Sequence, residues 1–167
     1  SNVRLRTRTK CSEGLVAYVV FGPSSTGTVN GMPVRADQLL TAGLGAEVGF
    51  VVEPGWESIT FLLPAMDLDA HLSVRKRSSL LPPPGEAVML SATPDVTNKL
   101  FAWGKQLTET AAKQPELFHV GERMLAALQI EIFEKLLATI GVAEVFEPSR
   151  SDRTRQRQSR IVKLAEE

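Results

Sequence analysis

The sequence predicts an α+β fold in which a strand-rich first part is followed by helices. Three observations lead to this prediction. Between residues 3 and 63, short runs of β-branched and apolar residues are separated by turn residues. From Pro64 onward, apolar residues recur at helical spacing instead. The proline run at 82–84, followed by Gly85, marks the clearest boundary, because proline and glycine interrupt regular structure.

The first part predicts about six short strands, a pattern that favours a small barrel or sandwich. Residues 3–10 alternate basic side chains with apolar or threonine side chains, which is the period of a strand with one wet face. Asn30 and Gly31 form the strongest short signal for a hairpin, because both turn positions need positive φ. The other expected strands cover 15–21, 38–44, 46–53 and 56–63.

The second part predicts one short helix and then a pair of longer ones. The short helix begins at Pro64. Thr93 and Pro94 then suit a helix start, with proline at the first helical position, and apolar spacing extends this helix to about Gln114. Another helix is expected from Pro115 to Ile140, where Gly141 is placed to cap its end. The pair predicts an αα-hairpin that buries one face on a sheet or on a partner subunit.

The composition is that of an ordinary globular chain. The 167 residues are 43% hydrophobic and 23% charged, which is enough apolar material for one domain with an appended helical piece. The net charge is zero, so the chain as a whole has no electrostatic footprint for nucleic acid. The basic residues nevertheless gather at the two ends, within 4–10 and within 150–163.

The sequence predicts no catalytic, metal or cofactor site. His71 and His119 are the only histidines, each in or near a helix, and a metal site needs several converging ligands. Cys11 is the only cysteine, and no serine occupies a nucleophile elbow. No run approaches the ~18 apolar residues that span a bilayer. We therefore expect a cytoplasmic protein without membrane contact.

Several segments resemble a bacterial regulator of the AraC/XylS family. They are DQLLTAG at 37–43, PGWESITFLLP at 54–64, the expected helical hairpin, and SRSDRTR at 149–155 followed by IVKLA at 161–165. Their order and spacing are similar to those of the family's sensor domains and the linker that follows. The family's specific signature, a pair of helix-turn-helix units, lies in a DNA-binding domain that this sequence does not contain.

The resemblance implies a small cupin-like β-barrel, an αα-hairpin and a C-terminal linker helix. It divides the chain into a sensor region at 1–81, a helical dimerisation hairpin at 82–145, and a linker at 146–167 toward an absent helix-turn-helix domain. The implied function is effector sensing and dimerisation in a transcriptional regulator that contacts DNA only through that absent domain. We expect the chain to be part of a longer protein.

Two sets of site residues are expected. A small organic effector is expected in the barrel interior, because an aromatic ring and hydroxyls alternate on one strand face, and such mixtures suit pockets. The alternative is that this face meets solvent while Ile59, Phe61 and Leu63 fill the core. The expected effector residues are Trp56, Ser58, Thr60 and Leu62, with Tyr18 as a further one. A homodimer is expected through the second long helix, at Leu125, Leu128, Ile132, Phe133, Leu136 and Leu137.

Two other functions remain open at this point. One is a small-molecule enzyme on a cupin-type barrel, which the shortage of metal ligands disfavours. The other is an interaction module that binds no ligand.

Overall fold

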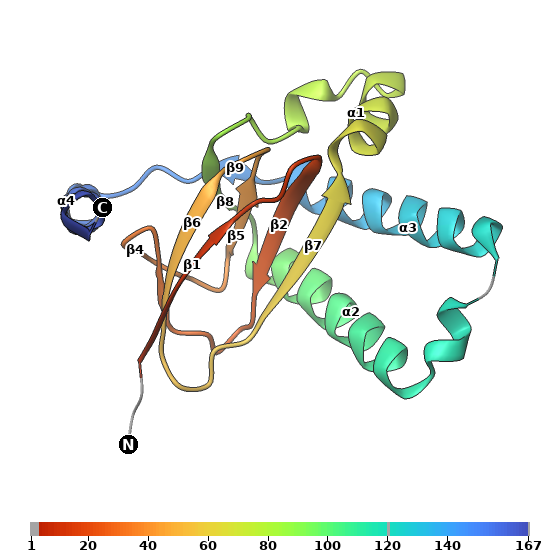
Figure 1. Cartoon of the computed structure of the whole chain (residues 1–167), viewed down its shortest axis with the longest axis horizontal. Coiled ribbons are helices and arrows are strands. Elements are labelled where there is room, and N and C mark those ends of the chain that lie inside the picture. The colour runs from red at the N-terminus through yellow and green to blue at the C-terminus, as the bar shows by residue number, and fades with distance from the viewer. Residues whose placement is uncertain (1–3, 120, 167) are drawn as a thin grey trace.

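The structure, a computed structural model, describes residues 4–119 and 121–166 and confirms the α+β class. Two antiparallel sheets and four α-helices make up the described part of the chain (Figure 1). The helices are α1 (Ala65–Val74), α2 (Pro94–Lys113), α3 (Glu122–Ile140) and α4 (Arg150–Glu166). Short 3₁₀ turns precede β8, at Ser78–Leu80, and α3, at Pro115–Phe118.

The four-stranded sheet has the order β1-β6-β3-β4. Asn30 and Gly31 turn the chain between its two shortest strands, with φ of 49° and 80°, so the expected hairpin is confirmed. β1 pairs along its whole length with β6, and it is exposed on both faces. The strands are β1 (Leu5–Lys10), β3 (Gly27–Val29), β4 (Met32–Pro33) and β6 (Glu47–Val52).

The five-stranded sheet has the order β7-β2-β5-β8-β9. Its inner strands β2 and β5 are almost entirely buried, which explains why their sequences are nearly continuous apolar runs. β8 and β9 come from the segment 82–145 that was expected to be helical, and they add to β5. The strands are β2 (Leu15–Phe21), β5 (Gln38–Ala42), β7 (Ser58–Pro64), β8 (Ala87–Ser91) and β9 (Glu144–Val145).

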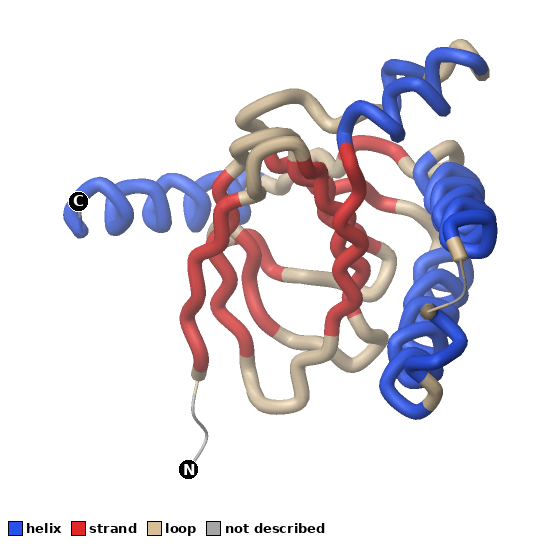
Figure 2. The backbone as a smooth tube through the Cα atoms, turned by 45° about the vertical axis from the view of Figure 1, so that its right-hand side comes forward, coloured by secondary structure: helices blue, strands red, loops and turns tan. Residues whose placement is uncertain are grey.

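The two sheets face each other without closing into a barrel (Figure 2). Among the described residues, β1 pairs only with β6 and β7 pairs only with β2, so both strands are open edges. The space between the sheets is filled by side chains that include Phe21, Val29, Leu40 and Met89. We call this set the inter-sheet core.

Helices α1, α2 and α3 cover the other face of the five-stranded sheet (Figure 2). Their side chains pack with Tyr18, Leu39 and Phe61 in a second cluster, here called the helix-side core. Gly104 of α2 lies close to β7, because a Cβ atom there would approach Ile59 Cγ2 to 2.7 Å. This close approach fixes α2 on the sheet edge.

The long helices differ in how well the sequence predicted them. α2 starts at Pro94 and ends at Lys113, as expected, and Thr97 ties its first turn to the turn before β5 by donating a 2.6 Å hydrogen bond to the Ala36 carbonyl. α3 starts at Glu122 rather than at Pro115, so that expectation was wrong. Proline does fit a first helical turn, but that turn is a separate 3₁₀ turn, and Gly121, which has low helix propensity, stands before α3.

Candidate functional site

Three of the residues expected to bind an effector lie on one face of β7, toward the inter-sheet side. Ser58, Thr60 and Leu62 stand opposite Phe21, Val19 and Ala17 of β2, which belong to the inter-sheet core. Directly opposed residues of an antiparallel pair project to the same face. However, β7 is an edge strand that the other sheet does not cover, so Thr60 and Leu62 are exposed, Leu62 by 56%.

Trp56 is half-buried and packs against the inter-sheet core. Its ring makes edge contacts with Phe21 at 5.5 Å and with Phe50 at 6.3 Å between centroids, and Nε1 donates a 3.2 Å hydrogen bond to Ser58 Oγ. The structure therefore brings Trp56 and Ser58 together in a packed cluster. Thr60 and Leu62 lie farther along β7 and are exposed to solvent.

Tyr18 does not join this group. It belongs to the helix-side core on the opposite face of the five-stranded sheet, and its hydroxyl donates a 3.4 Å hydrogen bond to the Leu80 carbonyl. Burial raises the pKa of its phenol well above the ordinary value, so the hydroxyl stays protonated. Side chains alternate between the two faces along a strand. Tyr18 therefore projects to the face opposite that of its neighbour Ala17, which pairs with Leu62.

A hollow of about 210 Å³ lies along the open edge of β7, between this strand and helices α2 and α3. Thr60 and Leu62 line it on the strand side, Gly104 and Leu107 on the α2 side, and Ile132 on the α3 side. Two residues expected to bind an effector and one expected to form a dimer thus border the same space.

The expected dimer residues divide into two groups along α3. Phe133, Leu136 and Leu137 are buried in the helix-side core, so they stabilise the single chain and are not available to a partner. Their interpretation as dimer residues is therefore corrected by the packing. Leu128 and Ile132 are half-buried, and Leu125 is 48% exposed.

The first half of α3 presents an apolar surface to solvent. Met124 and Leu125 are both about half exposed, and Leu117 in the preceding 3₁₀ turn is exposed to a similar degree. Met124 and Leu125, together with Leu128 and Ile132, form a row at helical spacing, which we call the α3 row.

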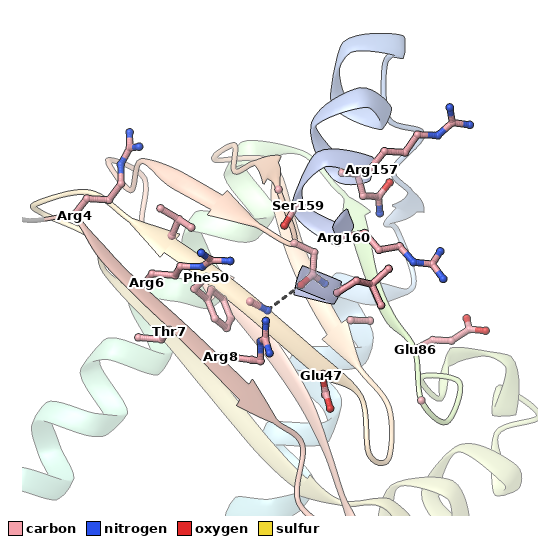
Figure 3. Close-up of a pocket in the computed structure, with 18 residues that line it drawn as sticks. Arg4, Arg6, Thr7, Arg8, Glu47, Phe50, Glu86, Arg157, Ser159 and Arg160 are labelled. Carbon is pink, nitrogen blue, oxygen red and sulfur yellow. Dashed lines mark hydrogen bonds between the residues drawn. The ribbon is translucent and has the colours of Figure 1, made fainter. Parts of the chain in front are cut away.

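A larger groove, of about 1340 Å³, lies on the outer face of the four-stranded sheet beside α4. Arg6 and Arg8 border it from β1 and Arg4 from just before that strand, while Arg157 and Arg160 border it from α4 (Figure 3). Glu47 and Glu86 also line it, and Arg4 pairs with Glu53 at 2.6 Å. The sequence shows two basic segments, at 4–10 and 150–163, but it did not predict that residues of both would border one groove. The side chain of Lys163 lies outside the described residues.

Glycine permits the contact that brings α4 to this groove. Gly31, at the tip of the β3–β4 hairpin, has φ of 80°, and a Cβ atom there would lie 2.8 Å from Ser159 Cβ and 2.9 Å from the Arg155 carbonyl oxygen. Any larger residue would push α4 away. The hairpin turn at Asn30 and Gly31 thus fixes the position of α4, which forms one wall of the groove.

The start of α4 is held by a capping box. Ser149 Oγ donates a 2.7 Å hydrogen bond to Asp152 Oδ2, and the Asp152 backbone N–H donates back to Ser149 Oγ at 3.2 Å. The hydrogen bond from Ser149 holds the pKa of the Asp152 carboxyl below its ordinary value, and the nearby Arg35 acts in the same direction. Arg35 also lies over the Phe146 ring at 5.3 Å, which joins α4 to the loop before β5.

The two histidines and the cysteine lie in separate parts of the fold. His71 Nε2 lies 3.1 Å from Glu134 Oε1, which links α1 to α3, and His119 is exposed. Cys11 is buried, and burial raises the pKa of its thiol. Within the described residues, no group of three or more histidine, cysteine or acidic side chains is placed to hold a metal ion.

Comparisons with known proteins leave the chain without an assigned family. No protein-family description, no curated protein and no solved structure matches it. Among residues 4–119 and 121–166, no helix combines the length and apolar character needed to cross a bilayer.

Proposed function

We propose that this chain is the effector-sensing and dimerisation part of a DNA-binding transcriptional regulator, with the two sheets as an open, cupin-like barrel. The observation that carries the proposal is the hollow at the β7 edge, because strand residues Thr60 and Leu62 share it with Ile132 of the α3 row. The order of sheets, helical hairpin and C-terminal helix also agrees with the resemblance to AraC/XylS sensor domains.

The effector binds in the β7 hollow. Its volume of about 210 Å³ suits a molecule of few heavy atoms, below the usual ~300–1,000 Å³ of drug-sized sites. Apolar side chains provide most of the lining, while Thr108 of α2 provides a hydroxyl that orients a polar group. A bound molecule contacts the strand and both long helices, so it changes how firmly α3 is held.

The dimer forms through the α3 row. A second copy of the helix covers Met124, Leu125 and Leu128 in a two-fold arrangement, where the same patch contacts itself. Ile132 lies at the end of this row and in the effector hollow, so it links the two events. Effector binding and dimerisation then favour each other by the same factor, as linkage requires.

Sequence-specific DNA recognition belongs to a further domain joined through α4. Ile161 and Leu164 are each about 65% exposed near the end of this helix, and Val162 is 43% exposed. A helix end with three large apolar side chains in solvent suits burial against another folded unit. A conformational change in the sensor region is then transmitted through α4 to the DNA-binding domain.

The dimer is tested by sedimentation equilibrium over a range of protein concentrations. We expect a concentration-dependent dimer that Leu125→Asp converts to a monomer, because a charge would be buried in the seam. Ile130→Asp serves as the matched control, since Ile130 is 52% exposed on α3 and is not part of the α3 row. A wild-type chain that stays monomeric at high micromolar concentration would contradict the proposal.

The effector site is tested by thermal unfolding in the presence of a panel of small aromatic and aliphatic acids and alcohols. A ligand at ~100 times its Kd adds about 2.7 kcal/mol to the free energy of unfolding. Leu62→Asp should abolish the stabilisation, whereas Leu44→Asp, at an exposed leucine in the turn after β5, should leave it intact. Equal responses in the two variants would place the ligand elsewhere.

A further inference from the structure

The groove beside α4 concentrates positive charge on a chain whose net charge is zero. Five arginines border it, against the carboxylates of Glu47, Glu86 and Glu53, the last of which pairs with Arg4, so basic side chains remain in excess. They come from the opposite ends of the sequence and meet only because α4 rests on the β3–β4 hairpin through Gly31. The fold thus assembles a basic surface that composition alone does not reveal.

The positive side chains on the sheet side form a row. Arg6 and Arg8 project from the same face of β1, opposite Val51 and Gly49 of β6. Alternate residues of a strand stand about 6.7 Å apart, so these arginines present charges at a regular interval along an edge strand. A row of like charges favours a ligand that carries repeated negative charge.

The shape of the groove also indicates a polymer rather than a small molecule. Its volume of about 1340 Å³ exceeds the usual ~300–1,000 Å³ of small-molecule sites, and it is open along the sheet. Gly49 and Gly85 line it and leave room for close approach, since an added Cβ atom would meet at most Asn30 Oδ1 at 3.6 Å. Arginine binds phosphate with a planar, bidentate arrangement of donors, which suits a phosphodiester chain.

We propose that this groove binds the phosphate backbone of duplex DNA without sequence preference. The choice of DNA among polyanions rests on the proposed function, in which a further domain recognises the operator. β1 and α4 contact the backbone from two sides and add affinity to that specific contact. A flat lipid surface fits less well, because the arginines border a hollow rather than a convex face.

The experiment measures fluorescence anisotropy of a labelled, random-sequence DNA duplex with this chain as the titrant. We expect a Kd of roughly 1–100 μM at physiological salt, with tighter binding near ~50 mM salt, because the affinity falls steeply as salt rises. Arg157→Gln with Arg160→Gln should lower the slope of log K against log salt by about 2, since each phosphate contact contributes ~0.9. Arg6→Gln with Arg8→Gln tests the opposite wall and should act in the same direction.

The matched control is Lys113→Gln with Arg123→Gln, which removes the same charge at the far end of the α2–α3 hairpin (Figure 1). It should keep nearly the wild-type slope. Circular dichroism confirms that each variant is folded. Absence of binding near ~50 mM salt, or equal losses in groove and control variants, would overturn the proposal.

Other polyanions are compared directly. Tighter binding to anionic phospholipid vesicles or to heparin than to duplex DNA would also overturn the assignment of DNA as the ligand. Failure here is distinguishable from failure of the proposed function, because dimerisation and effector binding are measured without any nucleic acid.

Discussion

The two sheets differ in how they are covered, and this difference separates stability from binding. The five-stranded sheet has the inter-sheet core on one face and the helix-side core on the other, so its central strands are buried on both faces. The four-stranded sheet is covered on one face only. Its outer face and its edge strand β1 remain open and form the basic groove. Changes in the buried central strands of the first sheet should cost stability, whereas changes on the open face of the second should alter the binding of polyanions.

The largest expected effect comes from truncating a leucine in the five-stranded sheet. Leu39 is fully buried in the helix-side core, so Leu39→Ala should lower the free energy of unfolding by about 2–5 kcal/mol. The same truncation at Leu5 of β1, which is 54% exposed, should cost less than about 1 kcal/mol. Urea unfolding measures both values, and equal losses would contradict the contrast between the sheets.

A smaller effect is expected where α2 meets the edge of the five-stranded sheet. Gly104→Ala places a Cβ atom 2.7 Å from Ile59 Cγ2 and 2.9 Å from Phe61 Cζ, so it should destabilise the fold by about 1–3 kcal/mol through overpacking. Gly121→Ala is the control, because no heavy atom lies within 4 Å of its added Cβ. Unchanged thermal stability of the first variant would show that α2 can move away from β7 at little cost.

Alkaline pH should weaken the helix-side core through the only tyrosine of the chain. The folded-state pKa of Tyr18 is raised, so its contribution is complete below the unfolded-state pKa of about 10 and is lost as pH rises beyond it. Tyr18→Phe should flatten the alkaline part of the stability profile. Ultraviolet absorbance of the phenolate should appear together with unfolding, and ionisation in the folded chain would argue against the burial of Tyr18.

The smallest effect is expected at the start of α4, and its pH dependence has the opposite direction. The folded-state pKa of Asp152 is lowered, so its contribution is complete above the unfolded-state value of about 3.9 and is lost as pH falls through the folded-state pKa. The helical circular dichroism of α4 should therefore decrease in acid. Asp152→Asn keeps a capping side chain without a charge, so the acid-induced change should vanish in that variant.

Local patterns predicted the elements better than they predicted their assembly. Asn30 with Gly31, and Thr93 with Pro94, marked the hairpin and the start of α2, because turn and cap chemistry depends on a few neighbouring residues. The strand β8 was missed. Its five residues form an apolar run too short to distinguish a strand from a buried helix, and its pairing with β5 joins positions far apart in the sequence.

The candidate sites were predicted only in part for the same reason. Alternation along β7 placed Thr60 and Leu62 on one face, but whether that face is covered depends on the other sheet. The helical spacing of the apolar residues of α3 can be recognised in the sequence. Which of them are buried, such as Leu136, and which are exposed, such as Leu125, depends on where the helix leaves the core. The basic groove was not predicted, because it requires the contact of α4 with Gly31.

The two tryptophans of the chain lie in different cores, which provides a separate optical signal for each. Trp56 packs between the sheets against Phe21, and Trp103 stacks on Phe61 at 6.0 Å on the helix side, with Lys135 Nζ 5.2 Å from its ring. Replacing either one with phenylalanine leaves a single emitter. The emission of each variant during unfolding then reports whether the two sides of the five-stranded sheet come apart together or in succession.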